Sequence, residues 1–362
     1  MKKLLVSIQE KPQVYPIIIG EDLIATVDSL FDFGKYSKIA IITGKNIPKK
    51  WLTELQKSLP FESFHILVPS SEKGKTIDTV INIWNQFQKL GMDRKSLVIN
   101  LGGGVICDMG GFAASTYLRG IDFLQIPTTI LAQVDASVGG KTGINFNNIK
   151  NYIGAFQQPI GVVIDVNTLS TLPERVYIQG FAEIIKHGLI ADRVYFDFVT
   201  SKKPKDFNTS ELTQMLAKSN EIKRKIVEED QKERGIRKIV NFGHTIGHAI
   251  ESLSFETDTP FLHGEAVLLG MIVETKISEL TDLLPAEDAA IIYERLSRLG
   301  LPLNVGKIKV EDIIKKIKTD KKVVKGQVNW TLLNSIGRAI YNQKVDDKIV
   351  EQALKTVVKY GG

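Results

Sequence analysis

Short, continuous apolar runs recur along the first half of the chain. They lie at 38–43, 64–68, 96–101, 123–126 and 162–165. A run that does not alternate between apolar and polar positions is typical of a strand buried on both faces, as in parallel sheets. Helical patterns lie between the runs, for example at 79–90, where a glycine follows as a helix stop. The first half is therefore predicted to be an α/β domain built on a parallel sheet.

The spacing of apolar residues changes after Pro173, and helical periodicity dominates from there. A mostly helical second half is predicted, with a small hairpin near its end, so that the chain divides into domains 1–172 and 173–362. The predicted helices lie at 175–199, 211–229, 248–253, 265–280 and 286–299, and the predicted strands at 327–333 and 338–341.

Composition narrows the class of protein. The 362 residues are 43% hydrophobic and 24% charged, which excludes a disordered, collagen-like or disulfide-stapled chain. The single cysteine, Cys107, cannot form an internal disulfide, and residues 9–11 interrupt the apolar start of the chain before it makes a signal peptide. No run approaches the roughly 18 apolar residues of a membrane span. We therefore expect a soluble, cytoplasmic protein that does not act on membranes.

The charge balance is mildly positive, with 47 Lys and Arg against 41 Asp and Glu. Such an excess suits anionic substrates as well as nucleic acid. The lysine-rich stretch 315–325 has the pattern of a solvated helix face, and Trp330 is the only aromatic residue near it. Binding of nucleic acid favours aromatic residues interleaved with the charges, so no nucleic-acid partner is expected.

Two glycine-rich segments follow predicted strands. Gly-Gly-Gly-Val at 102–105 lies between a strand and a helix, where backbone N–H groups can bind a phosphate. Its spacing is not G-x-G-x-x-G, so a tight strand-to-helix turn explains it equally well. A Gly-Gly-Lys loop within 135–143 follows Pro127-Thr128-Thr129, and a Lys-Asn pair comes at 150–151. These donors suit an anion, although a solvated loop can hold any one of them.

Candidate metal ligands gather in the helical half. Three of the five histidines are His244, His248 and His263. His244 and His248 are one helical turn apart and share a face, a spacing that suits a divalent metal such as zinc. Glu183, inside an apolar helical pattern, adds a carboxylate. A single histidine of this kind is more often a surface or packed core residue. The spacing alone leaves open whether His248 or Glu183 completes a ligand set.

In their order and spacing, these motifs resemble the 3-dehydroquinate synthases of the shikimate pathway. The resemblance runs from about residue 70 to residue 325. The motifs that carry it lie at 102–105 with Asp108, 119–120, 127–129, 135–143, 150–151, 171–174, 182–183, 186–188, 241–244, 247–249, 263–265 and 320–322.

The resemblance implies a dehydroquinate synthase-like fold: a Rossmann-like dinucleotide-binding α/β domain followed by a mostly α-helical metal- and substrate-binding domain. It implies a lyase that converts 3-deoxy-D-arabino-heptulosonate 7-phosphate to 3-dehydroquinate and phosphate. The reaction combines transient oxidation, elimination of phosphate, reduction and an intramolecular aldol step, so that NAD is not consumed. The implied cofactors are NAD and Zn²⁺ or Co²⁺, and the implied assembly is a homodimer.

The resemblance also assigns residues. It implies that Glu183, His244 and His263 bind the metal and that His248 contacts the substrate. The implied NAD contacts are Glu72, Lys75, Gly103, Gly104, Val105, Asp108, Thr128, Thr129, Asp135, Lys141, Lys150, Thr168, Leu169 and Thr171. The implied catalytic and substrate residues are Lys141, Lys223 and Arg237 for the carboxylate, Asn151, Asn241, His248 and Lys321 for the phosphate, Lys186, and Arg119 from a neighbouring subunit.

The chain departs from the family pattern at three positions. Gly44 follows Thr43 where an acidic residue is expected at the adenosine ribose, which weakens the expected NAD contact. Ser71 and Cys107 stand where glycines are usual. None of these positions lies in the helical half.

Related proteins offer alternative functions. A metal-dependent dehydrogenase of the glycerol-dehydrogenase type would not need so many carboxylate and phosphate partners. Cyclases that form inosose or valiolone rings act on substrates without this carboxylate, against which Arg237, Asn241 and His248 argue together. A synthase of an aminated substrate would have nearly the same residues. A non-catalytic scaffold protein would have lost part of the metal set, which is complete here.

Overall fold

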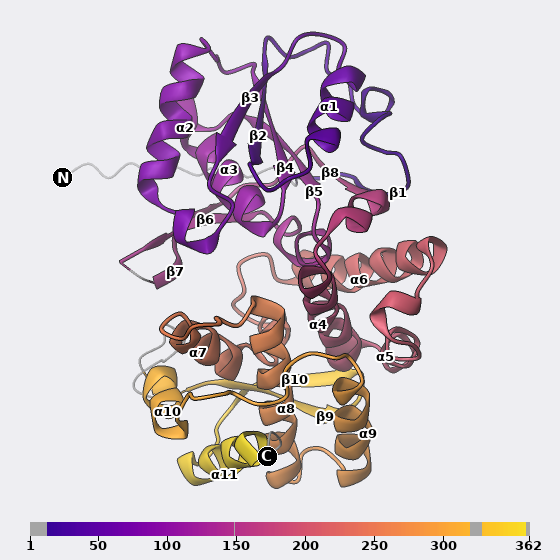
Figure 1. The fold of residues 1–362 in the computed structure, drawn as a ribbon, viewed down its shortest axis with the longest axis vertical. Coiled ribbons are helices and arrows are strands. Elements are labelled where there is room, and N and C mark those ends of the chain that lie inside the picture. The colour runs from indigo at the N-terminus through magenta and orange to yellow at the C-terminus, as the bar shows by residue number, and fades with distance from the viewer. Residues whose placement is uncertain (1–12, 148, 319–327, 360–362) are drawn as a thin grey trace, which may run out of the picture.

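A parallel sheet forms the centre of the first half of the molecule (Figure 1). The computed structural model describes residues 13–147, 149–318 and 328–359. All neighbouring strands of this six-stranded sheet are parallel. Their spatial order is β1 (Ile17–Gly20), β8 (Gly161–Asp165), β5 (Asp122–Pro127), β4 (Leu97–Gly102), β2 (Ile39–Gly44) and β3 (Phe64–Val68). The five predicted strands are confirmed; β1, only four residues long, is additional.

Both faces of the sheet are covered, which explains the continuous apolar runs. Ile39 and Ile41 of β2 pack in one core cluster with α1 (Lys49–Ser58). Ala40 and Ile42 of the same strand pack in another with α2 (Ile77–Lys89) and α3 (Gly104–Thr116). Successive side chains of a strand point to opposite faces, so each face buries half of the run.

The segment predicted as a donor-rich loop is in large part an antiparallel hairpin of β6 (Lys141–Phe146) and β7 (Ile149–Phe156). Gly139 and Gly140, both with positive φ, form the turn that leads into it. The apolar pattern gave no signal for these strands because the residues of β7 are all exposed or half-buried.

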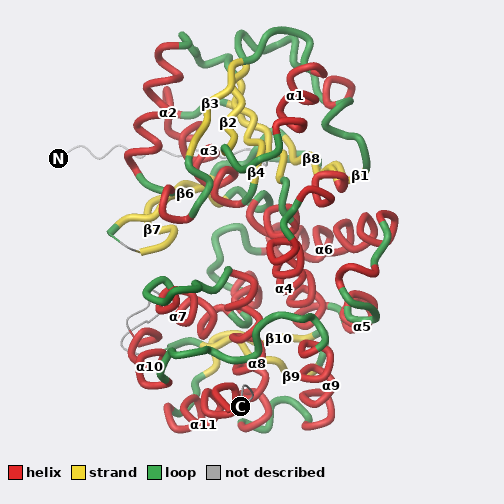
Figure 2. Tube along the Cα trace, in the orientation of Figure 1, coloured by secondary structure: helices red, strands yellow, loops and turns green. Residues whose placement is uncertain are grey.

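The second half is mostly helical, as predicted (Figure 2). The predicted helix at 175–199 is wrong in one respect, because it breaks into two at Asp192, whose side chain accepts a hydrogen bond from Tyr195 N and caps the second. The small hairpin near the end is confirmed. The elements are α4 (Glu174–Ala191), α5 (Arg193–Val199), α6 (Thr209–Glu229), α7 (His244–Ser254), α8 (His263–Leu280), α9 (Ala286–Ser297), α10 (Val310–Lys318), β9 (Trp330–Ser335), β10 (Arg338–Gln343) and α11 (Asp347–Lys359).

The carboxyl ends of the sheet strands face the helical half. A short π-helical segment, η4 (Ala132–Ala136), follows β5 and contacts α4 and α6. The 3₁₀ segment η5 (Val166–Thr171) follows β8 and also contacts α6. Residues at these strand ends therefore meet residues of the helices. Over the residues that the structure describes, no helix combines the length and the apolar character needed to cross a membrane.

Candidate active site

Glu183 and two histidines converge between three helices. Glu183 lies in the middle of α4, while His244 and His263 are the first residues of α7 and α8. Oε1 of Glu183 lies 3.5 Å from Nε2 of His244 and 3.6 Å from Nε2 of His263. Zinc bonds of about 2.0–2.1 Å in a tetrahedral set place neighbouring ligand atoms about 3.3 Å apart. Both distances from Glu183 Oε1 are therefore close to those expected between two ligands of one ion.

The Glu183 carboxylate has the properties of a ligand rather than of a structural hydrogen-bond acceptor. It is fully buried, and its partners among the described residues are the Lys186 ammonium and the imidazoles of His244 and His263. The Lys186 ammonium forms an ion pair with it. Burial alone would raise the pKa of Glu183, but Lys186 and His244 outweigh burial and lower it. The carboxylate is therefore anionic and available to a cation.

The second nitrogen of each imidazole is oriented by an acceptor. Nδ1 of His244 lies 3.1 Å from the Phe242 carbonyl oxygen, and Nδ1 of His263 lies 3.2 Å from Oε2 of Glu251. An Nδ1–H held in this way leaves Nε2 with its lone pair toward the site, the usual arrangement of metal-binding histidines. Lys150 of the β6–β7 hairpin forms an ion pair with Glu251 at 2.5 Å, so the first half reaches this site.

Two other groups of ligand-type atoms share the same space. The imidazoles of His244, His248 and His263 come within 4.8 Å of one another, as do Asp135, Glu183 and His187. Nδ1 of His187 lies 2.6 Å from Ser219 Oγ. Burial, together with Lys186, lowers the pKa of His187 to about 3, so its ring is neutral. The geometry thus brings His248 and Glu183 to one site, and both ligand sets that the spacing left open remain compatible with it.

The starts of α7 and α8 are held by buried polar contacts. Glu274 of α8 is fully buried, and its carboxylate accepts hydrogen bonds from the backbone N–H groups of Gly243, Thr245 and Ile246, at 2.6, 3.1 and 3.3 Å. Gln179 of α4 accepts from Gly264 N at 2.7 Å. These bonds fix the first turn of each helix, which is where both histidines lie.

Cationic side chains surround the acidic centre. Lys223 of α6 is buried and bonds both the backbone oxygen and the carboxylate of Asp135 in η4. Burial would raise the pKa of Asp135, but Lys223 and Lys186 hold it well below its usual range. Arg237 is also buried, and its guanidinium donates to the Gln231 carbonyl at 2.6 Å. A buried site with three cations is suited to an anionic substrate.

Lys141 and Asn241 meet through Glu233, a residue that the sequence did not single out. Glu233 forms an ion pair with Lys141 and accepts a hydrogen bond from Asn241 Nδ2 at 2.6 Å. It thereby connects the hairpin with the segment before α7.

Polar residues line the carboxyl ends of the sheet strands. Gly103 and Gly104 form the turn from β4 into α3, as the sequence predicted, with Val105 in the first turn of the helix. The buried hydroxyl oxygen of Thr128, after β5, makes no hydrogen bond with the described part of the chain, so it is available to a ligand. Thr129 Oγ1 instead accepts from Ala132 N at 3.2 Å. Thr168, Leu169 and Thr171 lie in η5 after β8.

Lys75 joins two other predicted residues near this edge. Its ammonium lies 2.5 Å from Asp108 Oδ2 and also donates to Asn151 Oδ1. Glu72 is oriented by Asn145, whose Nδ2 donates to Glu72 Oε1 at 2.8 Å. Asn151, predicted to bind the phosphate, therefore contacts the predicted NAD-binding residue Lys75.

Two predicted residues are not brought to this site by the described chain. Arg119 is exposed in a 3₁₀ turn (Tyr117–Arg119) that leads into the start of β5, at the opposite end of the sheet. Lys321, with its neighbours in the 320–322 motif, lies outside the described residues.

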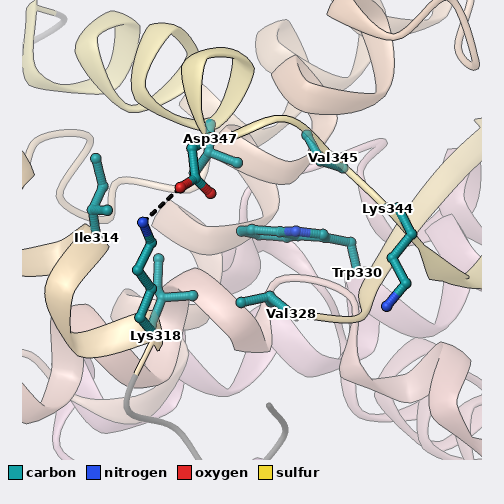
Figure 3. A pocket seen from close by; sticks show the side chains of 9 residues that line it. Ile314, Lys318, Val328, Trp330, Lys344, Val345 and Asp347 are labelled. Atoms are coloured by element: carbon teal, nitrogen blue, oxygen red, sulfur yellow. Dashed lines mark hydrogen bonds and ion pairs between the residues drawn. The ribbon is translucent and has the colours of Figure 1, made fainter. Parts of the chain in front are cut away.

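A cavity of about 300 Å³ lies elsewhere, between α10, β9 and α11 (Figure 3). Trp330 forms one wall, and Lys318 and Asp347 form an ion pair at 2.6 Å across its mouth. None of the predicted site residues lines it.

The sequence analysis did not single out Glu233, Glu251 and Glu274, and two of these three have a recognisable sequence signal. Glu251 and Glu274 are acidic residues inside otherwise apolar helical patterns, which is where a buried charge must have a role. Glu233 lies in a run of charged residues and gives no such signal.

Comparison with known proteins agrees with this geometry. The chain matches the model of the 3-dehydroquinate synthase N-terminal region over residues 65–179 and that of the C-terminal region over residues 180–323. It is 41% identical to the 3-dehydroquinate synthase of Ruminiclostridium cellulolyticum, over 96% of this chain and 98% of the relative. It is 40% identical to that of Ruthia magnifica, over 98% of this chain and 99% of the relative.

Solved structures confirm the fold. The 2-epi-5-epi-valiolone synthase of Streptomyces hygroscopicus, solved with NAD⁺ and Zn²⁺, superimposes with a TM-score of 0.88 at 24% identity, over 98% of this chain and all of that chain. A 2-deoxy-scyllo-inosose synthase complexed with carbaglucose-6-phosphate, NAD⁺ and Co²⁺ gives 0.84 at 26% identity, over 94% of this chain and 96% of that one. The relatives share the synthase name over nearly the whole chain, and the family models meet within α4, so this chain belongs to the 3-dehydroquinate synthase family.

Proposed function

We propose that this chain converts 3-deoxy-D-arabino-heptulosonate 7-phosphate to 3-dehydroquinate and phosphate, with NAD and a divalent metal as cofactors. The observation that carries the proposal is the Glu183 carboxylate between the imidazoles of His244 and His263, with buried Lys186, Lys223 and Arg237 beside it. Family membership and cyclase neighbours solved with NAD⁺ and Zn²⁺ or Co²⁺ support it.

The residues present fit both cofactors. Glu183, His244 and His263 would hold Zn²⁺ or Co²⁺, since their ligand atoms have the spacing of one coordination sphere. The glycine turn at 103–104 would receive the NAD pyrophosphate, because backbone N–H groups at the start of a helix bind phosphate. When bound, the metal would polarise the hydroxyl to be oxidised, and NAD would take up and return a hydride.

The chain's own residues bind the substrate and stabilise developing charge. Arg237 and Lys223 would bind the substrate carboxylate, the guanidinium being suited to a bidentate contact. Lys186 lies beside Glu183 and would face the oxyanion that forms at the oxidised carbon. Asn241 and His248 would bind the phosphate until it leaves by elimination, with one of its own oxygens as the base.

The remaining site assignments belong to the same proposal. The NAD-binding set at the strand ends would comprise Glu72, Lys75, Asp108, Thr128, Thr129, Asp135 and the η5 residues, with Lys141 and Lys150 from the hairpin. We also propose that the chain divides into an NAD-binding domain, 1–172, and a metal- and substrate-binding domain, 173–362, and that it acts in the cytoplasm.

We further propose a homodimer in which Arg119 of one subunit reaches the substrate of the other. Arg119 and Leu118 are exposed, and both have positive φ. The β6–β7 hairpin, which packs on the same α3 helix, exposes Phe146, Ile149 and Tyr152. Light scattering should give twice the chain mass. A monomer that retains full turnover would contradict this assembly.

The direct test is phosphate release from the heptulosonate phosphate by the purified chain with Zn²⁺ and catalytic NAD, coupled to a dehydratase. One phosphate and one dehydroquinate per turnover, with no net NADH, are expected. Activity on glucose 6-phosphate or sedoheptulose 7-phosphate instead would assign the chain to a sibling cyclase, and activity on neither would overturn the proposal.

A further inference from the structure

The end of β2 holds a group of residues that the proposed reaction does not use. These are Gly44, Lys45 and Asn46 at the end of β2 and just beyond it, with Ser70 from the segment after β3. Thr43 of β2 is paired with Leu101 of β4 in the parallel ladder, so the end of β2 lies beside the glycine turn after β4. Residues in this position of an α/β sheet contact a dinucleotide at the point where the strand order reverses.

The position of the metal ligands decides which end of the dinucleotide lies at the end of β2. Gly104 is in close contact with η4, since a Cβ at Gly104 would lie 3.2 Å from Ala136 Cβ. Asp135 of η4 comes within 4.8 Å of Glu183. The nicotinamide end must therefore extend from the glycine turn toward η4. The adenosine end would then extend the other way, toward the end of β2 and the first turn of α1, two elements labelled in Figure 1.

An acidic residue at the end of such a strand binds the ribose 2′-hydroxyl of NAD and repels the 2′-phosphate of NADP. This chain has Gly44 there, and its neighbours fill the space of a side chain. A Cβ at Gly44 would lie 2.7 Å from Asn46 Oδ1 and 2.7 Å from Ser70 Cβ. Ser70 Oγ donates a hydrogen bond to the same Asn46 oxygen. A neutral polar pair thus stands where the acid would be.

The segment that leads from β2 into α1, on the Asn46 side of this pair, is positively charged, while Glu72 follows Ser70 by two residues on the other side. Residues 43–53 include three lysines, Lys45, Lys49 and Lys50, and no Asp or Glu. Lys45 is exposed and forms no ion pair with a described residue. Lys49 and Lys50 open α1, where a cation is unfavourable to the helix dipole. The helix dipole therefore does not account for these lysines, and an anion beside them would be attracted.

The first turn of α1 is also fixed against η5. Trp51 Nε1 donates to Thr171 Oγ1 at 3.0 Å, and Lys50 Nζ lies 3.9 Å from the centre of the Trp51 ring. Trp51, with Lys50 over its ring, is thus held against η5, and Lys45 lies in the turn between β2 and this helix.

From these observations we propose that the adenosine end accepts a 2′-phosphate, so that this chain binds NADP as well as NAD. Lys45 is the residue that contacts the phosphate, and the Asn46 amide binds the ribose hydroxyl when NAD is present. The proposal rests on the NAD site of the proposed function.

Calorimetric titration of the zinc-loaded protein with NAD and with NADP tests it. We expect the dissociation constant of NADP to be within about tenfold of that of NAD, and the NADP affinity to fall more steeply with salt, because its extra charge is screened. Binding of NAD with NADP more than about 100-fold weaker would overturn this inference and leave the proposed function intact. Binding of neither would contradict the NAD site itself.

Two variants test separately the charge of Lys45 and the absence of an acidic side chain at position 44. Lys45→Glu should weaken NADP at least about tenfold while changing NAD less than about threefold, because only the 2′-phosphate faces the new charge. Lys57→Glu, the same charge change at the far end of α1, should alter neither. Equal loss of both dinucleotides in Lys45→Glu would contradict the role of Lys45.

The second variant places an acidic side chain at position 44. Gly44→Asp with Ser70→Gly removes the Ser70 contact, so that only the exposed Asn46 side chain has to move aside for the new carboxylate. The double variant should strengthen NAD and weaken NADP by about 100-fold or more. Ser70→Gly alone is its matched control and should keep the dual binding. An unchanged ratio in the double variant would show that Gly44 does not face the ribose.

Discussion

At the scale of single residues, two side chains compete for one role. Glu183 and His248 both lie next to His244 and His263, and helical spacing favours the histidine while the distances from Glu183 Oε1 favour the carboxylate. The carboxylate is fully buried and anionic, whereas His248 is only half-buried. A buried anion needs compensating positive charge, and a metal at Oε1 would add to that of Lys186 at Oε2, so Glu183 is the better candidate for the ligand.

Substitutions of Glu183 and His248 test which of the two binds the metal. Glu183→Gln keeps the shape but removes the charge, so metal content should fall from about one ion per chain to nearly none. His248→Ala should keep the metal and lose at least about 100-fold in turnover, since it removes a substrate contact. Elemental analysis after dialysis measures the first effect and phosphate release the second. Full metal content in Glu183→Gln, or loss of metal in His248→Ala, would favour the three-histidine set.

At the scale of elements, the site depends on where α7 and α8 begin. The two helices pack closely through glycine, because a Cβ at Gly270 would lie 1.9 Å from the Gly243 carbonyl oxygen. This approach lets Glu274 reach the N-terminal N–H groups of α7. An anion at that end also interacts favourably with the helix dipole. The start of α7, and with it His244, is therefore set by a residue of α8.

Replacing Glu274 tests whether its carboxylate sets the position of His244. Glu274→Gln keeps an acceptor but removes the charge, and should cost about 1–3 kcal/mol of unfolding free energy and about tenfold or more in zinc affinity. A chelator competition gives the affinity, and the visible spectrum of the Co²⁺ form reports the ligand geometry. Glu279→Gln on the same helix removes a partly exposed ion pair with Lys276 and is the control. A zinc affinity equal in both variants would contradict a role for Glu274 in positioning His244.

At the scale of the whole molecule, the metal would join elements that are distant in the sequence. Its ligands come from α4, α7 and α8, and Lys150 of the hairpin contacts Glu251, the partner of His263. A ligand that binds only the folded state stabilises it, by about 2.7 kcal/mol at 100 times its dissociation constant.

Removal of the metal should therefore lower the melting temperature. Scanning calorimetry of the chelator-treated and zinc-reconstituted protein should show a rise with zinc that grows with its free concentration. The rise should be absent in Glu183→Gln, which cannot hold the ion. Identical melting temperatures with and without zinc would contradict a site built from three helices.

Much of the fold follows from local pattern. Five of the sheet strands were predicted because a strand buried on both faces requires a continuous apolar run. The hairpin at 141–156 was missed because its second strand has no buried face. The break at Asp192 was missed because the apolar period continues through it, and only the capping bond to Tyr195 ends one helix and starts the next.

The sequence by itself determined the elements, the family and the residue types of the site, because spacing along a strand or helix is a local property and the motifs occur in a specific order. The tertiary structure decided which of these residues meet. Only the packing of α8 against both α4 and α7 brings Glu183 within 3.6 Å of both histidines, and only the sheet order places Gly44 beside the glycine turn. Contacts between distant segments depend on packing, which no local spacing records.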